Sequence, residues 1–550
     1  MKYSPIYAFI IIGLFLTLNL QSQNIDQVEL NTKIESLIPP AVNNTTPGFV
    51  IGVIQKGELI FSKGYGLANL SYNIPNDPKM AYNIGSVSKQ FLGYAFAMLH
   101  VEGKLNIDEP VSKYLENWPE FDEIVTLKHL LNHTSGYREA YTMSRLAGRV
   151  IGVDRLSRSE CLNVVRKQPK LEFEPGSQFT YNSTAWVILA EVLEKVTGQP
   201  ADEWLEANIL NPLEMKNTYI ESFVGEVIPN AAESYNYNKN KGYTNSKSNR
   251  AIFGAADINT SIEDLTKWVN NFKTLKAGGK EAMELFLTPF NLDDNPKTGY
   301  ALGIQVGFHK GVKFYSHNGG HASFVTQLRY YPEEEIGIIT MSNLGGKGAI
   351  STGKIAEFLL EGQMKSKKEK TNDSVFKMDK NELKKFAGIY ISPTLNKTTP
   401  IVMENDTLVI WGRSKLIPTS PNSFRTKNWD GKFEIKTQPD GSLQLEIIGD
   451  SKTIYNKFPE SSQTLKELKE YEGEYWSEEI ETVYHLKIEN EKLIIEHRWL
   501  GKVKLNLISV DFFKSNRGWH LKVERSEENK ITGFNINSGR TLNVFFKRKE

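Results

Sequence analysis

The pattern of apolar and polar positions changes character near residue 365. Between residues 30 and 362, strand-like runs such as FVIGVIQ and IGIITMSN alternate with longer runs such as QFLGYAFAMLHVEGK and AWVILAEVLEKVTG. In the longer runs apolar residues recur every three or four positions, which is typical of helices buried along one face. Beyond residue 378, strict alternation dominates, as in TLVIWG and KLIIEHRW. The sequence therefore predicts a mixed α/β part followed by an all-β part.

A polar segment separates the two parts. SKKEKTND (366–373) contains no apolar side chain, so we expect residues 366–378 to form an exposed linker. We expect the preceding residues, 24–365, to fold as a unit.

The all-β part contains an internal repeat. LKKFAGIYIS (383–392) and LKEYEGEYWS (468–477) share the pattern L-K-x-[FY]-x-G-x-Y-x-S. A period this long favours duplicated domains over a solenoid. The sequence predicts two β modules, 379–459 and 460–550, and leaves open whether they form two units or two halves of one closed barrel.

The first 23 residues differ from the rest of the chain. Lys2 precedes the uncharged apolar run AFIIIGLFLTLNL (8–20), and polar QSQ follows it. This pattern is typical of a secretory signal peptide, and the run is short for a membrane span. We therefore expect residues 1–23 to be the signal peptide of an exported, periplasmic or secreted protein. Retention of this segment as an N-terminal anchor stays open.

Composition excludes several classes of function. Lys and Arg number 66 against 65 Asp and Glu, a formal net charge of +1. A nucleic-acid partner is therefore not expected, since such binders usually carry a basic excess. The single cysteine, Cys161, allows no internal disulfide and no cysteine metal cluster. No phosphate-cradling or dinucleotide-binding glycine loop follows a strand, so neither cofactor nor metal is expected.

The candidate chemistry lies in a Ser-x-x-Lys motif. Only the pair Ser86 and Lys89 precedes a long apolar helical run. The spacing places Lys89 one helical turn from Ser86 on the same face, and a lysine partly buried there can take the proton of the serine. In the alternative interpretation Ser86 only caps the helix and Lys89 faces solvent. The chain contains two further pairs of this kind: Ser351 with Lys354, and Ser374 with Lys377.

Five sequence blocks, in this order, resemble the serine β-lactamase-like, penicillin-recognising hydrolase family. They are NIGSVSKQF around Ser86, TLKHLLNHTSGY (126–137), EPGSQFTY (174–181), FGAADINTSIEDLTKW (253–268) and SHNGGHASF (316–324). The chain is most similar to the branch that contains class C β-lactamases, D-alanine carboxypeptidases, D-aminopeptidases and related esterases. The resemblance implies an α/β (α+β) catalytic domain, with an antiparallel sheet flanked by helices and a helical subdomain. The tail resembles the lipocalin-like modules attached to some of these hydrolases.

The resemblance also implies a role for each matching residue. Ser86 would be the acylated nucleophile, Lys89 its base and Tyr181 the relay of the proton to the leaving group. His317 would stand at the first position of the family's Lys-Thr-Gly strand motif. The N–H groups of Ser86 and Gly320 would form the oxyanion hole, and the remaining substrate-binding residues would be Ser183, Asn318 and Gly319.

Two departures from the family pattern affect the expected substrate. The usual Tyr-x-Asn motif reads Tyr181-Asn182-Ser183, and His317 replaces a lysine that would anchor a substrate carboxylate. A neutral imidazole pairs weakly with a carboxylate near pH 7. Both changes favour an ester, amide or D-amino-peptide substrate without that carboxylate over a penicillin.

The predicted function is that of an exported serine hydrolase with an acyl-enzyme mechanism, acting on a small-molecule, ester or peptide substrate. Peptidoglycan-derived peptides belong to this substrate range. The alternative is a non-catalytic penicillin-recognising sensor or ligand-binding protein with a lipocalin-like tail. We expect no membrane span after signal cleavage, and homo-oligomer formation through the β modules stays open.

Overall fold

The structure is a computed structural model that describes most of the chain. It covers residues 26–251, 253–292, 298–346, 350–365, 375–395, 397–427, 429, 431–449, 452–459 and 462–550. The predicted signal peptide, 1–23, and most of the predicted linker lie outside these residues. Helix α1 (Gln27–Ser36) belongs to a first compact unit, which ends at Ile38, and the described residues from Pro39 to Glu550 form a second. Within the described ranges, no helix is long and apolar enough to cross a membrane.

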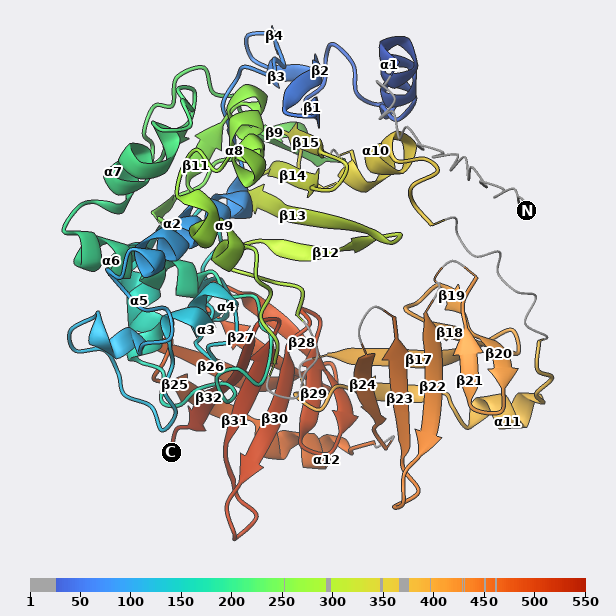
Figure 1. Cartoon of the computed structure of the whole chain (residues 1–550). Helices are drawn as coiled ribbons and strands as arrows, with labels where there is room; N and C mark the ends of the chain where they lie inside the picture. The colour runs from blue at the N-terminus through green and yellow to red at the C-terminus, as the bar shows by residue number, and fades with distance from the viewer. Residues whose placement is uncertain are drawn as a thin grey trace, which may run out of the picture. The chain divides into compact units, whose positions relative to one another are not determined.

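A six-stranded antiparallel sheet forms the centre of the α/β part (Figure 1). Strand β1 is an apolar run that ends in Gln55, with all but this last residue buried, and it pairs with β15 from the end of this part of the chain. The strands in order across the sheet are β12 (Gln305–His309), β13 (Val312–His321), β14 (Phe324–Tyr331), β15 (Ile336–Ser342), β1 (Phe49–Gln55) and β2 (Glu58–Tyr65).

Helices cover this sheet and form the helical subdomain. Helix α8 packs against β1 and β15, and α10 packs against β14 and β15. Helix α2 is buried over nearly its whole length, because it lies within the main hydrophobic core together with α6. The helical elements are η1 (Gly85–Ser88), α2 (Lys89–Val101), η2 (Val111–Lys113), α3 (Leu127–Leu131), α4 (Ala140–Leu146), α5 (Arg158–Arg166), α6 (Thr184–Thr197), α7 (Ala201–Leu205), η3 (Glu206–Leu210), α8 (Ile262–Thr274), α9 (Gly279–Phe286) and α10 (Thr352–Leu359).

Short strands complete the α/β part in small sheets. They are β3 (Leu67–Asn69) with β4 (Ile74–Pro75), β6 (Leu156–Ser157) with β10 (Arg250–Ala251), β8 (Tyr235–Asn238) with β9 (Gly242–Asn245), and β5 (Tyr82–Asn83), β11 (Ile258–Thr260) and β7 (Tyr219–Ile220). The predicted fold class, an antiparallel sheet flanked by helices with all-β modules behind it, is confirmed.

The first β module is a nine-stranded sheet that nearly closes on itself. Its two outermost strands, β19 and β20, are separated in the chain only by Leu416. Helix α11 (Lys380–Lys384) precedes it. In order across the sheet the strands are β19 (Ser414–Lys415), β18 (Thr407–Ile410), β17 (Thr398–Glu404), β16 (Gly388–Ile391), β24 (Lys452–Lys457), β23 (Leu443–Ile448), β22 (Lys432–Thr437), β21 (Ser423–Arg425) and β20 (Ile417–Ser420).

The second β module is a closed eight-stranded barrel, which we call the C-terminal barrel (red in Figure 1). It closes because β25 pairs with β32 as well as with β26. The two modules therefore form two separate sheets and not two halves of one barrel. Helix α12 (Leu465–Leu468) and η4 (Lys469–Tyr471) precede β25 (Gly473–Ser477), β26 (Thr482–Glu489), β27 (Lys492–His497), β28 (Gly501–Ser509), β29 (Phe512–Ser515), β30 (His520–Arg525), β31 (Ile531–Ser538) and β32 (Thr541–Arg548).

The repeated sequence motif has the same structural role in both modules. The hydroxyl of Tyr390 donates to the carbonyl of Phe386, and that of Tyr475 donates to the carbonyl of Tyr471, each at 2.9 Å. The glycine between each pair has a positive φ, +143° and +153°, which other residues rarely adopt. The motif thus ties the first strand of each module to the turn that precedes it.

The core of the C-terminal barrel is filled by side chains, two of which come from the α/β part. Met143 and Leu146 of α4 belong to the same hydrophobic cluster as Tyr484, Phe534 and Phe546 of the barrel. The hydroxyl of Tyr484 also donates to the carbonyl of Leu146 at 2.6 Å. This packing argues against the alternative in which the barrel holds a ligand.

Candidate active site

Ser86 and Lys89 lie at the start of the buried helix α2. Ser86 is in η1, which runs directly into α2, and Lys89 is the first residue of α2. The Nζ of Lys89 lies 3.1 Å from Ser86 Oγ and donates to the carbonyl of Ala255 at 2.7 Å. The side chain of Lys89 is fully buried, so the interpretation in which it faces solvent does not describe this structure.

Burial tunes the proton affinity of Lys89. It lowers the pKa of the ammonium from 10.5 to about 7, against the opposing charge of Asp257 and with a further lowering from Arg540. The pKa of Asp257 is raised to about 7, again mainly by burial. Near neutral pH Lys89 is therefore in part a free amine that can accept a proton from Ser86.

Tyr181 lies beside this pair with its hydroxyl buried. Lys89 Nζ lies 5.3 Å from the centroid of the Tyr181 ring. Burial raises the pKa of Tyr181 to about 12, partly offset by the nearby Ser86 hydroxyl, so the phenol keeps its proton at neutral pH. No partner in the described part of the chain makes a hydrogen bond of ordinary geometry with this hydroxyl. It is a buried donor available to a bound substrate.

His133 supports Tyr181 and was not recognised from the sequence as part of the site. Its ring packs on the Tyr181 ring with centroids 4.1 Å apart, and its Nδ1 accepts from the N–H of Asn182 at 3.0 Å. The side chain of Asn182 turns away from the site and donates to the carbonyl of Tyr137. His133 lies within the block TLKHLLNHTSGY (126–137), which the sequence analysis singled out without assigning it a residue of the site.

His317 forms the opposite wall of the site as a neutral imidazole. Its Nδ1 lies 2.7 Å from the carbonyl oxygen of Asn318, and its Nε2 lies 2.8 Å from the hydroxyl of Tyr300. Because a carbonyl only accepts, Nδ1 carries the hydrogen and Nε2 accepts from Tyr300. Burial lowers the pKa of His317 to about 3, so this residue supplies no cation to a substrate.

Two glycines bring strand β13 into direct contact with η1. A methyl group on Gly319 would lie 1.8 Å from the carbonyl oxygen of Ile84, and one on Gly85 would lie 2.5 Å from the nitrogen of Gly320. Only glycine permits this approach. The backbones of Ser86 and Gly320, the predicted oxyanion hole, therefore lie on two segments that touch.

The predicted residues meet at one cavity of about 610 Å³. Lys89 lies behind Ser86, and the other predicted residues line the cavity. The full lining is Ser86, Tyr141, Phe179, Tyr181, Ser183, Arg250, Ala255, Ala256, Thr298, Tyr300, Gln305, His317, Asn318, Gly319, Gly320 and Arg540. Within the described residues, no group of three or more His, Cys, Asp or Glu side chains is placed to hold a metal ion.

The cavity also contains cations that sequence analysis missed. Arg250 and Arg540 both line it, whereas the expected preference for substrates without a carboxylate considered only the position of His317. Arg540 comes from the hairpin between β31 and β32, and its guanidinium carbon lies 4.8 Å from the centroid of the Tyr181 ring. No local pattern marks an arginine in a distant hairpin as part of this site.

Comparison with known proteins finds relatives of the α/β part. A family model described as Beta-lactamase matches residues 34–357. A Bacillus subtilis (strain 168) protein named as a candidate penicillin-binding protein, PbpX, is 25% identical over 294 residues, which cover 53% of this chain and 69% of that protein. A D-aminopeptidase from Gluconobacter oxydans is 22% identical over 310 residues, 56% of this chain and 58% of the enzyme, so the match spans less than two thirds of that relative.

Solved structures share the fold. An octameric penicillin-binding protein homologue from Pyrococcus abyssi has a TM-score of 0.56 at 23% identity, covering 78% of this chain and 100% of that one. A D-stereospecific amidohydrolase from Streptomyces sp. has a TM-score of 0.50 at 22% identity, covering 62% of this chain and 99% of that one. Because the family match takes in more than half of the residues, the resemblance seen in the sequence is confirmed, and the chain belongs to the β-lactamase family.

Proposed function

We propose that this protein is an exported serine hydrolase that cleaves amide or ester bonds through an acyl-enzyme on Ser86. The observation that carries the proposal is the fully buried Lys89, whose Nζ lies 3.1 Å from Ser86 Oγ in a cavity of about 610 Å³. A lysine whose pKa is lowered to about 7 is matched to proton transfer near neutral pH. Export rests on the signal-like segment 1–23.

In the first half-reaction Ser86 Oγ attacks the carbonyl carbon of the substrate and gives its proton to Lys89 Nζ. The carbonyl oxygen becomes an oxyanion, which the N–H groups of Ser86 and Gly320 stabilise. Fixed backbone donors in such a position contribute about 3–4 kcal/mol to the transition state. The proton then passes from Lys89 through the Tyr181 hydroxyl to the leaving nitrogen or oxygen, and the bond to the carbonyl carbon breaks.

In the second half-reaction water attacks the acyl-enzyme. Its proton returns through Tyr181 and Lys89 to Ser86 Oγ as the ester bond breaks, which releases the acid and restores the serine. Tyr181 serves in both steps as a donor and relay, because its raised pKa keeps it protonated. The role of His317 is to hold Tyr300 in the wall of the cavity through the 2.8 Å hydrogen bond.

The relatives favour D-amino-acid-containing amides and peptides as the first substrates to test. One is named D-aminopeptidase, and one structure of the same fold is a D-stereospecific amidohydrolase. Short-chain esters belong in the same panel because a serine that forms an acyl-enzyme from amides can also form one from esters, which have the better leaving group.

The test is covalent labelling combined with turnover. A fluorophosphonate probe should label the wild type and Ser351→Ala but not Ser86→Ala. Ser351 is the matched control, since it opens a second Ser-x-x-Lys segment at the start of α10 and lies outside the cavity. Turnover of D-amino acid anilides, D-Ala-D-Ala peptides, short-chain p-nitrophenyl esters and nitrocefin identifies the substrate class. A wild type that takes no label and turns over none of these would favour the non-catalytic sensor.

A further inference from the structure

The C-terminal barrel contributes a cation to the cavity around Ser86. Arg540 lies in the β31–β32 hairpin, stacks over the Tyr181 ring at 4.8 Å and lines the same cavity as Ser86 and His317. The residue is exposed, and no carboxylate in the described ranges forms an ion pair with it. Its charge is therefore available to a ligand in the cavity.

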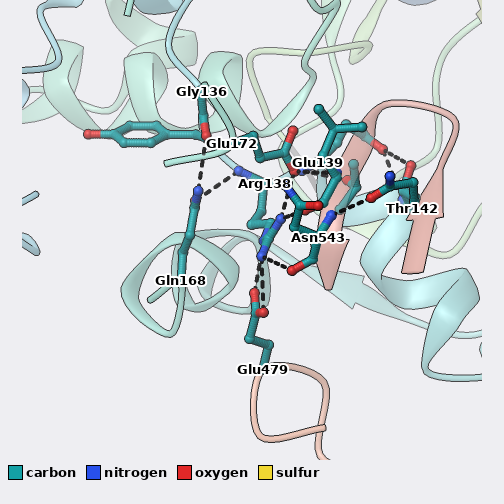
Figure 2. A network of polar contacts seen from close by, with 12 residues as sticks. Gly136, Arg138, Glu139, Thr142, Gln168, Glu172, Glu479 and Asn543 are labelled. Carbon is teal, nitrogen blue, oxygen red and sulfur yellow. Dashed lines mark hydrogen bonds and ion pairs between the residues drawn. The ribbon is translucent and has the colours of Figure 1, made fainter. Parts of the chain in front are cut away.

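A buried ion cluster holds this hairpin against the α/β part (Figure 2). Arg138, with a side chain only 2% exposed, binds both carboxylate oxygens of Glu479 from the barrel at 2.8 and 3.0 Å. It also binds Glu172 at 3.1 Å and donates to the backbone carbonyls of Leu542 and Asn543.

The cluster reaches the residues that directly follow Arg540. Glu172 accepts from the N–H of Leu542 at 3.1 Å, and the Oγ1 of Thr541 accepts from the N–H of Glu139 at 3.4 Å. The backbone on the C-terminal side of Arg540 is thus held at three consecutive residues. These contacts fix the backbone of the hairpin, and the fixed backbone brings the Arg540 guanidinium over the Tyr181 ring.

The other candidate cations in the cavity are less available. His317 is neutral and has both ring nitrogens occupied. Arg250 is engaged with His321 Nδ1 and Ser248 Oγ, each at 3.0 Å, and stacks on Tyr141. Of the two arginines that line the cavity, Arg250 uses its Nε and Nη2 in these contacts, whereas no side-chain hydrogen bond within the described residues engages Arg540. A planar guanidinium with free donors matches the two oxygens of a carboxylate.

We propose that Arg540 binds a carboxylate of the substrate, so that the C-terminal barrel sets the preference of this active site for anionic substrates. The proposal rests on the proposed hydrolase function and adds the substrate class to it. The position usually filled by the motif lysine is here His317, and a residue from a separate domain supplies the charge instead.

Arg540 also acts on Lys89, which provides a second readout. Its positive charge contributes to the lowered pKa of Lys89. Removing it should therefore move the acid limb of the pH–rate profile to higher pH, for charged and neutral substrates alike. To separate this effect from carboxylate binding, kcat/KM for an acid is divided by kcat/KM for its methyl ester at a pH above the pKa of Lys89. A change in the protonation of Lys89 affects both substrates and cancels in this ratio.

The experiment uses the full chain and two pairs of thioesters. In one pair, benzoylglycyl thioglycolate and its methyl ester, the carboxylate is in the leaving group. In the other, the adipoyl thioester of N-acetylcysteamine and its methyl ester, the carboxylate is in the acyl group. Thiol release gives kcat and KM for wild type, Arg540→Ala, Arg540→Lys and Arg540→Glu. The matched control is Arg498→Ala, because Arg498 is an exposed arginine of the same barrel that stacks on Trp499 at 5.1 Å outside the cavity.

In at least one pair, Arg540→Ala should lower the ratio of kcat/KM for the acid to that for the methyl ester by about 10- to 100-fold, mainly through KM. Arg540→Lys should recover part of the ratio, Arg540→Glu should lower it further, and Arg498→Ala should leave it unchanged. A ratio equal to the wild type's in both pairs for Arg540→Ala would overturn the proposal. Failure of the proposed function looks different: the wild type would then hydrolyse the methyl esters no faster than Ser86→Ala does.

Discussion

Replacing Lys89 with methionine should abolish acylation and at the same time stabilise the fold. The unfolded chain keeps the ammonium proton of Lys89 up to a pKa of 10.5, whereas burial lowers the pKa in the folded protein to about 7. At pH 7 this difference costs the folded state about 4 kcal/mol. Methionine has a similar length and carries no charge, so Lys89→Met removes the cost.

The substitution also loses two hydrogen bonds, from Nζ to Ser86 Oγ and to the carbonyl of Ala255. A buried carbonyl left without a partner costs about 1–3 kcal/mol. The balance predicts that Lys89→Met raises the free energy of unfolding by about 1–3 kcal/mol at pH 7. Between pH 7 and 10.5 the unfolded chain binds more protons than the folded one, so wild-type stability rises with pH and the advantage of the variant shrinks.

The measurement is urea unfolding followed by tryptophan fluorescence at pH 7 and pH 9, with fluorophosphonate labelling as the readout of acylation. Lys195→Met, an exposed lysine near the end of α6, is the control and should change stability by less than about 0.5 kcal/mol. A Lys89→Met variant no more stable than the wild type at pH 7, with the same difference at pH 9, would refute the reasoning.

Three further predictions follow from the site and from the interface between the parts. Below pH 7, kcat/KM for a neutral ester should fall about tenfold per pH unit as the buried lysine gains its proton; a flat profile from pH 5 to 8 would exclude it as the base. Gly319→Ala should lower kcat/KM by about 100-fold, because its methyl group would lie 1.8 Å from the carbonyl oxygen of Ile84. Gly320→Ala, whose methyl group would have its nearest atom at 4.0 Å, should lower kcat/KM far less. Equal losses of kcat/KM would show that the close approach of β13 to η1 is not critical. Glu479→Ala should destabilise the protein by about 3–5 kcal/mol in thermal or urea unfolding, because it leaves the buried arginine charge of Arg138 under-compensated. Glu481 lies in the same turn, and its side chain is 64% exposed in an ion pair with Lys167, so Glu481→Ala should cost less than about 1 kcal/mol. Similar losses of stability for the two variants would mean that burial of the ion pair does not determine its contribution.

Local sequence patterns predicted the parts of the site that depend on short-range geometry. The three-residue spacing of Ser86 and Lys89 becomes a hydrogen-bonded pair because both lie on one helical turn. The repeated tyrosines of the β modules become a repeated hydrogen bond to the carbonyl four residues earlier. His317 was expected to be a weak cation because a free imidazole is mostly neutral near pH 7. Burial lowers its pKa further, so in the structure it is neutral.

Contacts between distant segments were beyond sequence reasoning. Nothing near Arg540 indicates that its hairpin reaches Tyr181, since that contact depends on how the barrel docks. The prediction that residues 24–365 fold as a unit likewise took no account of contacts with the C-terminal barrel. Met143 and Leu146 look like ordinary helix residues, yet the barrel covers them. A chain that stops after residue 365 would expose both of them and leave Arg138 without Glu479.

The buried ion cluster also has a consequence for how the protein is made. Arg138 and Glu479 are 341 residues apart in the chain. At a synthesis rate of about 5–20 residues per second, the arginine leaves the ribosome roughly 20 to 70 s before its partner. During that interval Ser86 and Lys89 have already been synthesised, but the hairpin that carries Arg540 has not. The cavity around Ser86 therefore gains Arg540 as a lining residue only after the β31–β32 hairpin has been synthesised, long after Ser86 and Lys89 themselves.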